Sequence, residues 1–266
     1  MYTKHDIHLH TALSLCAKPT ATVENYLKIA KGYGLTTIGL TDHMWDSKIE
    51  GASNWYKTQD FEHINKVREQ IPEDTDGIKI LYGCETEFTH MGVLALTEET
   101  AEKLDYVLAP HSHTHMLDFI MPREYSASPE KFAEYLLKSF MMLVTHPMKK
   151  YITAIPHPLV PMGVTDNEAR KILSLITDNQ FEECFLAAKE ANIGIEINTS
   201  LFLQKNEDDV KNSEYIHLFT LAKQCGCKFC IGSDAHGLGY HDPFKYADLI
   251  MDICGITTDD FIALVK

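Results

Sequence analysis

The chain of 266 residues has few basic side chains, no long apolar run and no glycine-rich phosphate loop. Its 24 Lys and Arg stand against 38 Asp and Glu, giving a formal net charge of -14. A surface of that sign repels a phosphate backbone, so no general nucleic-acid partner is expected. No stretch approaches the roughly 20 apolar residues that a membrane-spanning helix needs. No GxGxxG or P-loop motif supports a nucleotide cofactor.

The N-terminal residues and the cysteines indicate the compartment. Residues 1–6 carry no basic segment followed by an apolar run, so no signal peptide is predicted and we expect a cytoplasmic protein. The seven cysteines are scattered in apolar contexts, and an odd number in a chain of this size favours reduced thiols over disulfides. Cys225, Cys227 and Cys230 are interpreted as core and turn residues, because the second CxxC pair of a zinc ribbon is missing.

The order of apolar segments predicts the fold class. Short β-branched runs alternate with longer segments of helical periodicity, which is typical of βα units. No linker rich in Pro, Gly or Ser divides residues 1–266, so a single α/β domain is predicted. The predicted strands occupy 5–10, 36–42, 78–84, 106–111, 153–158, 193–199 and 228–233. The predicted helices occupy 23–33, 58–70, 97–104, 129–145, two segments within 166–191, 210–225, 244–254 and a tail at 258–265.

Six of the seven predicted strands end in, or just before, a side chain able to bind metal. If the strands are parallel and close into a barrel, their C-terminal ends meet at one mouth. Burying so many carboxylates and imidazoles is costly unless they are paired or bind metal. Imidazole and carboxylate ligands without a thiolate array suit Zn, Mn or Fe. The residues that predict this metal centre are His8, His10, Asp42, His43, Glu85, Glu87, His111, His157, Asp234 and His236.

Several of these positions leave alternatives open. Asp42 is either a helix N-cap or a residue that orients a ligating histidine. His111 directly closes its predicted strand and is the favoured ligand there. His113 and His115 follow it in a loop, where they either contact substrate or belong to an ordinary polar loop.

Two further choices rest on strand position. Glu85 and Glu87 share a strand face, and Glu85 is favoured as the ligand. His157 follows an apolar segment, whereas the other HP dipeptide, at His146, follows a long helical stretch. The sequence therefore favours His157 as the ligand.

Six motifs, spread in order along the chain, carry a resemblance to a known family: DIHLHT, GLTDH, GCETE, VLAPHSH, IPHP and IGSDAH. With this spacing the sequence resembles the PHP (polymerase and histidinol phosphatase) family. Its size and the EINTS segment resemble the histidinol-phosphatase-like branch. The resemblance implies a distorted TIM-like (β/α)7 barrel, two or three divalent metal ions at its mouth, and phosphoester hydrolysis.

The resemblance also implies which residues hold the ions. One ion would be held by His8, His10, Glu85 and Asp234. Glu85 would bridge to a second ion held by His111 and His157, and a third would be held by His43 and His236. At the position where the family usually has another histidine, six residues after His10, this chain has Cys16. Cys16 either ligates as a thiolate or leaves the third site weak or empty.

The expected reaction is hydrolysis of a small phosphate monoester, with histidinol phosphate as the first candidate. Two ions bridged by Glu85 would make a hydroxide from water, and Asp234 or His236 would protonate the leaving group. Arg123 and His113 are the candidate substrate contacts. Two alternatives stay open. The same site could cleave a phosphodiester, amide or lactone, or the chain could be a non-catalytic metal-binding regulatory module, a reading that Cys16 favours.

Overall fold

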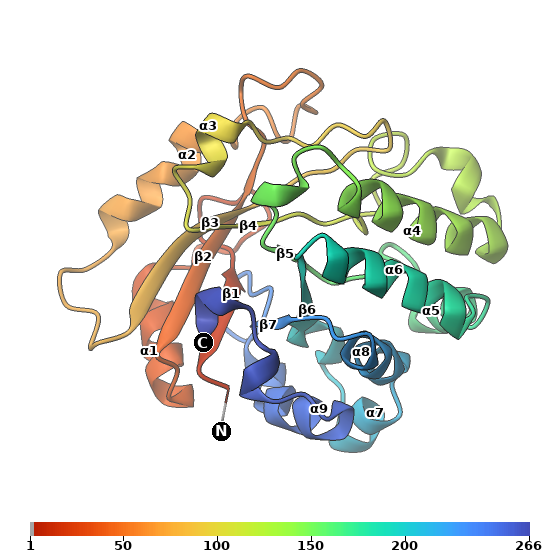
Figure 1. Ribbon diagram of the computed structural model, residues 1–266. Coiled ribbons are helices and arrows are strands. Elements are labelled where there is room, and N and C mark those ends of the chain that lie inside the picture. The colour runs from red at the N-terminus through yellow and green to blue at the C-terminus, as the bar shows by residue number, and fades with distance from the viewer. Residues whose placement is uncertain (1–2) are drawn as a thin grey trace.

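Seven parallel strands follow one another around a barrel in chain order (Figure 1). The computed structural model describes residues 3–266. A bridge between Leu9 and Ala235 joins the first strand to the turn after the last one, so the ring is nearly closed. The predicted distorted (β/α)7 barrel is confirmed. The strands are β1 His5–Leu9, β2 Thr37–Met44, β3 Lys79–Thr86, β4 Tyr106–Leu108, β5 Ala154–Ile155, β6 Gly194–Asn198 and β7 Phe229–Gly232.

Helices connect the strands and lie on the outside of the ring (Figure 1). Several begin at a Ser or Thr whose side chain accepts a backbone N–H, as Thr22, Ser128 and Thr177 do. Among residues 3–266, no helix has the length and apolar character needed to cross a bilayer. The helices are α1 Val23–Tyr33, α2 Phe61–Asn65, α3 Glu98–Ala101, α4 Pro129–Val144, α5 Asp166–Leu173, α6 Asp178–Glu190, α7 Glu207–Lys211, α8 Glu214–Gln224 and α9 Ala247–Cys254.

Apolar side chains fill both sides of the strands, as expected for a parallel sheet covered by helices. The larger cluster lies between strands and helices, and a smaller one includes Ile7, Leu81 and Leu108. The Tyr106 ring belongs to the smaller cluster and passes so close to Gly83 that an added Cβ would lie 2.5 Å from it. Only glycine leaves room for that ring.

Several predicted elements differ from the observed ones. The strand predicted over 106–111 ends at Leu108. The helices predicted over 58–70 and 210–225 are each divided in two, the first into α2 and a 3-10 turn and the second into α7 and α8. β5 has two residues because Pro156 and Pro158, which have no N–H to donate, follow it directly. The predicted helix over 97–104 is reduced to the four residues of α3. The predicted tail helix over 258–265 is instead two 3-10 turns, Thr258–Asp260 and Ala263–Val265. Between those turns, Ile262 donates its N–H to the carbonyl of Phe229 in β7, which a continuous helix would prevent.

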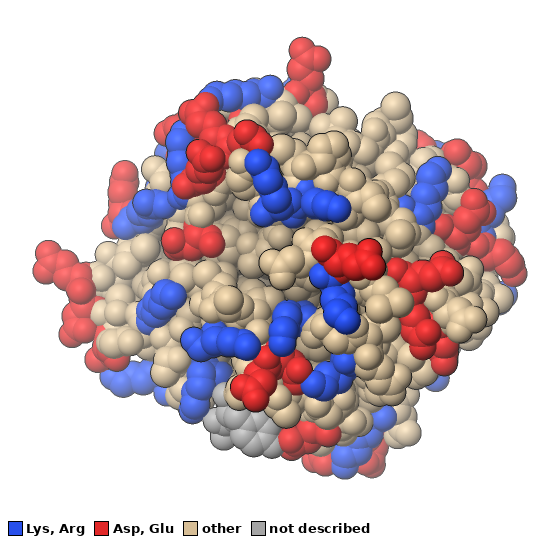
Figure 2. All heavy atoms as spheres, in the orientation of Figure 1, with Lys and Arg blue, Asp and Glu red and all other residues tan. Residues whose placement is uncertain are grey.

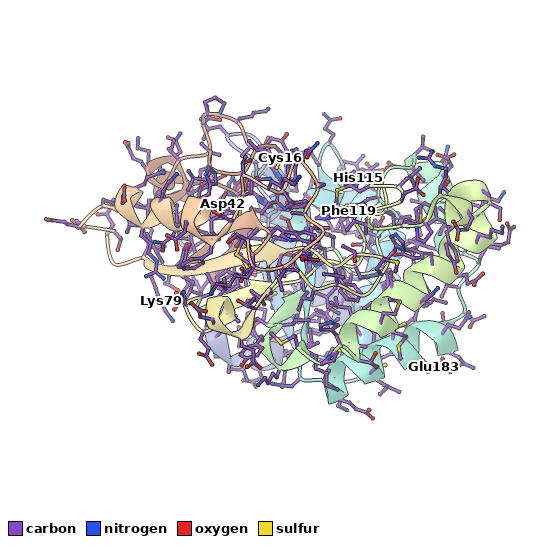
Figure 3. All side chains as sticks on the ribbon, turned by 90° about the horizontal axis from the view of Figure 1, so that it is seen from above. Cys16, Asp42, Lys79, His115, Phe119 and Glu183 are labelled. Atoms are coloured by element: carbon purple, nitrogen blue, oxygen red, sulfur yellow. The ribbon has the colours of Figure 1, made fainter. Side chains whose placement is uncertain are left out.

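The two ends of the barrel differ in the residues that they present. In Figure 3, Cys16 and His115 lie toward one end, while Lys79, which begins β3, lies toward the other. Figure 2 shows one face of the molecule, in the orientation of Figure 1, where basic and acidic side chains are interspersed. The polar residues that follow the strands gather at the end marked by Cys16 and His115.

Candidate metal centre

Glu85 lies at the centre of a buried polar cluster at the mouth of the barrel. It sits near the end of β3, in register with His43 of β2. Its two carboxylate oxygens face imidazole nitrogens from five histidines, at distances from 3.0 Å to 3.7 Å. The five are His8, His10, His43, His113 and His157. Histidines at or after the ends of four strands, β1, β2, β4 and β5, therefore meet around one carboxylate of β3.

The HxH pair and Asp234 form one side of this cluster. Nε2 of His8 lies 3.1 Å from Nε2 of His10. The Asp234 carboxylate, from the turn after β7, lies 3.5 Å and 3.3 Å from these two nitrogens. Asp234 and His157 both have positive φ, 52° and 32°. The fold holds both residues in a sparsely populated backbone conformation, and such strain concentrates at functional sites.

In five imidazoles, the ring nitrogen that points away from the cluster, Nδ1, forms a hydrogen bond that indicates which nitrogen carries the proton. In each ring Nδ1 faces an oxygen of the surrounding protein, so the N–H lies at Nδ1. Two of these oxygens are hydroxyls whose own hydrogens are directed elsewhere: Ser14 donates to Asp42, and Ser112 donates to a backbone carbonyl. The pairs are His8 with Glu196 (2.7 Å), His10 with Ser14 (3.2 Å), His113 with Glu87 (2.5 Å), His157 with Ser112 (2.7 Å) and His236 with the carbonyl of Asp234 (2.9 Å).

When these rings are neutral, their inward nitrogens present lone pairs. A neutral imidazole that donates from Nδ1 is an acceptor at Nε2. Lone pairs facing one another and a carboxylate, as between His157 and Glu85, repel unless a cation or a proton lies between them. Nδ1 of His43 is also buried and lies 3.1 Å from Glu85 without forming a hydrogen bond. This arrangement is what a metal site requires.

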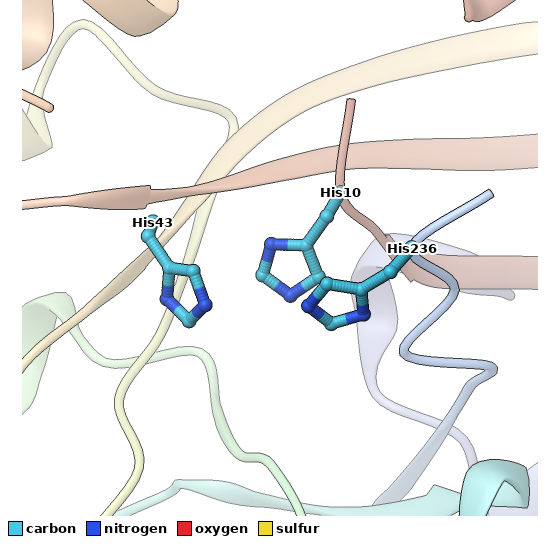
Figure 4. A group of neighbouring side chains, drawn as sticks. All are labelled: His10, His43 and His236. Atoms are coloured by element: carbon cyan, nitrogen blue, oxygen red, sulfur yellow. The ribbon is translucent and has the colours of Figure 1, made fainter. Parts of the chain in front are cut away.

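Within residues 3–266, three groups of side chains bring their ligand atoms within 4.8 Å of one another. Figure 4 shows one of them, in which His10 and His236 lie side by side and His43 faces them. Glu85 belongs to two of the groups and directs a different carboxylate oxygen toward each. His10 also belongs to two groups, but it has only one inward nitrogen, which could bind an ion in one group at a time. The groups are His8, His10 and Glu85; Glu85, His113 and His157; and His10, His43 and His236.

Charges in the cluster shift several pKa values. Burial would raise the pKa of Glu85, but His113, His43 and His8 hold it well below its usual range. Burial and the neighbouring His236 lower the pKa of His10 to about 4, so this ring is neutral at pH 7. Burial disfavours the charged form of His113, yet the carboxylates of Glu87 and Glu85 raise its pKa to about 9. The carboxylates thus favour a positive charge at the centre of the cluster. Imidazole and carboxylate ligands of this kind suit Zn, Mn or Fe.

The structure does not bring His111 into this cluster. Its Nε2 accepts a hydrogen bond from the N–H of Leu159 at 2.9 Å, and its Nδ1 lies 2.9 Å from the Ser139 hydroxyl. Burial lowers the pKa of His111 to about 3, so the ring is neutral. Both ring nitrogens are occupied within the protein. The geometry favours His113, two residues later, as the ligand where the sequence pattern predicts His111.

Cys16 and Arg123 do not belong to the three ligand groups. The side chain of Arg123 is 69% exposed and pairs with Asp118 at 2.9 Å, away from the residues that line the mouth. This position gives no support to the expectation that Arg123 contacts the substrate, which stays a prediction. Cys16 lines the mouth but belongs to none of the three groups. Burial and the nearby Glu85 raise the pKa of its thiol to about 12.

Above the cluster opens a pocket of about 470 Å³. Its size falls in the range of small-molecule sites. Glu85, Asp234 and four of the histidines, including His115, line it together with aromatic and methionine side chains. The full lining is Cys16, His43, Trp55, Tyr56, Glu85, His113, His115, Met116, Met162, Asp234 and His236. A small molecule in this pocket therefore lies directly against the ligand groups.

Sequence reasoning did not assign Glu196, Ser14 or Ser112 to the orientation of the imidazoles. Glu196 lies within the apolar body of β6, yet it accepts from His8 and from the N–H of His157 at 2.8 Å. Its charge inside a buried strand was the available signal. Ser14 and Ser112 gave no signal, because hydroxyl residues are common in loops.

Comparison with known proteins identifies the family of this fold and site. The PHP domain model matches residues 6–200. A probable phosphatase of Thermoanaerobacter sp. (strain X514) is 32% identical over 256 residues, which cover 96% of this chain and 87% of the relative. A probable phosphatase of Clostridium novyi (strain NT) is 30% identical over 87% of this chain and 78% of the relative.

A solved structure has a similar fold. It is the histidinol phosphate phosphatase of Lactococcus lactis, crystallised with zinc, L-histidinol and phosphate. The TM-score is 0.59 at 18% sequence identity, over 96% of this chain and 95% of that one. The likeness extends along the whole barrel.

Proposed function

This chain belongs to the PHP domain family, and from that premise we propose that it is a metal-dependent phosphatase that hydrolyses a small phosphate monoester. The observation that carries the proposal is the set of imidazoles whose outer hydrogen bonds turn Nε2 lone pairs toward Glu85. The names of the curated relatives and the phosphatase with a similar fold support the same chemistry.

The donor set supports two or three divalent ions. His8, His10 and Glu85, with Asp234 beside them, would hold one, and Glu85, His113 and His157 a second. His10, His43 and His236 would hold a third, with Cys16 as a candidate additional ligand. Divalent ions act as Lewis acids on a phosphoryl group and allow water to attack near neutral pH. Zinc, manganese and iron all suit these ligands, and the zinc in the structurally similar phosphatase favours zinc.

The chain's own residues would position the reactants. Glu85 would bridge neighbouring ions, because each of its oxygens faces a different group of histidines. Asp234 and His236 line the pocket and are the candidates to deliver a proton to the leaving alkoxide. Glu196 and Glu87 would keep His8 and His113 in the tautomer that binds metal. Histidinol phosphate is the first substrate to test.

The test measures bound metal and phosphate release together. The protein is purified without chelator, its metal content is determined, and a panel of phosphate monoesters is assayed beside a phosphodiester, an amide and a lactone. Glu85→Ala and Asp234→Asn are expected to abolish turnover while circular dichroism shows an intact fold. Full activity in both variants, or a protein that retains no metal and cleaves no monoester, would overturn the proposal.

A further inference from the structure

The pocket above the metal ligands has a polar floor and apolar walls. Carboxylates and imidazoles form the floor, and the walls include Trp55, Tyr56, Met116 and Met162. Trp55 is one of only two tryptophans in the chain. Any alcohol whose phosphate rests on the floor must place the rest of its structure against these walls.

The aromatic wall is a built feature of the fold. A hydrophobic cluster separate from the main core contains Trp45, Tyr56 and Ala95, and Trp55 and Met116 pack against it. The Trp55 ring meets the Tyr56 ring edge to face at a centroid distance of 4.6 Å, and His43 at 5.2 Å. Packing on two sides holds the indole beside the ligand groups without help from a bound molecule.

The lining carries no charge that suits a second ionic group on the substrate. Among the described residues 3–266, those that line this pocket include no Lys or Arg. Its carboxylates, Glu85 and Asp234, face the histidines of the ligand groups. A second phosphate, a carboxylate or an ammonium group would enter without a partner.

Building on the phosphatase function above, we propose that this enzyme prefers phosphate monoesters of uncharged aromatic alcohols, with the ring held against Trp55 and the methionines. Methionine thioethers pack well on aromatic rings, and aromatic side chains stack on them with an offset or edge to face. Trp55 and Met162 are then specificity-determining residues that act on the leaving group and not on the phosphoryl group. By this reasoning histidinol phosphate, which carries an ammonium group, is a poorer substrate than its neutral aromatic counterparts.

The experiment compares kcat/KM of the metal-loaded enzyme for alkyl phosphates that differ in the alcohol. Benzyl phosphate presents a neutral ring, phosphoethanolamine an ammonium, glycerol 1-phosphate hydroxyls, and histidinol phosphate a ring with an ammonium. We expect benzyl phosphate to exceed the others by roughly tenfold or more, the scale set by filling a hydrophobic pocket. Trp55→Ala and Met162→Ala should reduce that preference, mainly by raising KM for benzyl phosphate. Met91→Ala is the matched control, because Met91 is 75% exposed and does not line the pocket.

A binding measurement on the same holoenzyme gives a readout that is independent of turnover. Benzylphosphonate, which is not hydrolysed, should bind more tightly than methylphosphonate, and Trp55→Phe should keep most of the difference that Trp55→Ala loses. Equal rates on all four monoesters, or a preference for either ammonium-bearing substrate, would overturn the inference and leave the phosphatase function standing. Failure to cleave any monoester would overturn both.

Discussion

Metal binding at the Glu85 cluster should raise the melting temperature (Tm) of the protein. An ion present at a hundred times its dissociation constant stabilises the folded state by about 2.7 kcal/mol. With an unfolding entropy of about 2.1 cal/mol/K per residue, a chain of 266 residues gains about 5 °C in Tm for each such site. Two occupied groups therefore predict a rise of about 10 °C when zinc is returned to chelator-treated protein.

Glu85→Gln provides the decisive variant for this measurement. The amide keeps the size of the side chain but removes the charge that two of the three ligand groups share. We expect most of the zinc-dependent rise in Tm to disappear in this variant, because the charge that the bound ions would share has been removed. Glu69→Gln, on an exposed 3-10 turn, is the control and should keep the full rise.

The assay is differential scanning fluorimetry with metal content measured on the same samples. Identical Tm values for the parent with and without zinc would refute the reasoning. A full zinc-dependent rise in Glu85→Gln would refute it equally, because the ions would then bind elsewhere.

Four other outcomes follow from the same contacts. His113→Asn should lower the number of bound ions. His111→Asn should lower the free energy of unfolding and leave the metal content unchanged. Loss of metal in His111→Asn but not in His113→Asn would instead identify His111 as the ligand. Ser112→Ala removes the acceptor of a ligand imidazole's N–H and should weaken metal affinity about 10-fold to 100-fold in a chelator competition. Burial lowers the pKa of His5 from 6.5 to about 3, so only the unfolded chain binds this proton as pH falls from 6.5 toward 3. The free energy of unfolding is therefore unaffected by this group above pH 6.5 and should fall by about 2 kcal/mol between pH 6.5 and pH 5. Urea unfolding at the two pH values should show a smaller decrease for His5→Gln, because that variant lacks the titrating imidazole. Arg123→Ala should change kcat/KM by less than about twofold, because its exposed ion pair contributes little, and a tenfold loss would contradict that placement.

Sequence patterns were informative wherever a strand fixes the direction of a side chain. His8 and His10 occupy positions i and i+2 at the end of β1, and the period of two puts them on one face. Glu85 follows the same rule at the end of β3. These three side chains meet in one ligand group, as the placement of metal-binding residues at the strand ends predicted.

In the loop after β4, the sequence pattern did not predict which histidine faces the ligand cluster. β4 ends at Leu108, so His111 and His113 lie on irregular backbone that no periodicity constrains. Which of two histidines turns inward then depends on partners from distant elements, Ser139 of α4 for one and Glu87 for the other. The exposed pairing of Arg123 with Asp118 is a similar local outcome that sequence spacing does not encode.

The sequence by itself determined the barrel, its family and the residue types at the mouth, because alternating apolar segments and strand-end motifs are local properties of the chain. Tertiary structure alone decided which nitrogen of each imidazole faces inward, since that depends on hydrogen bonds to Glu196, Ser14 and Ser112 from other parts of the chain. Tertiary structure also decided that the pocket has apolar walls. Trp55, Met116 and Met162 come together only when three separate loops pack over the same strand ends.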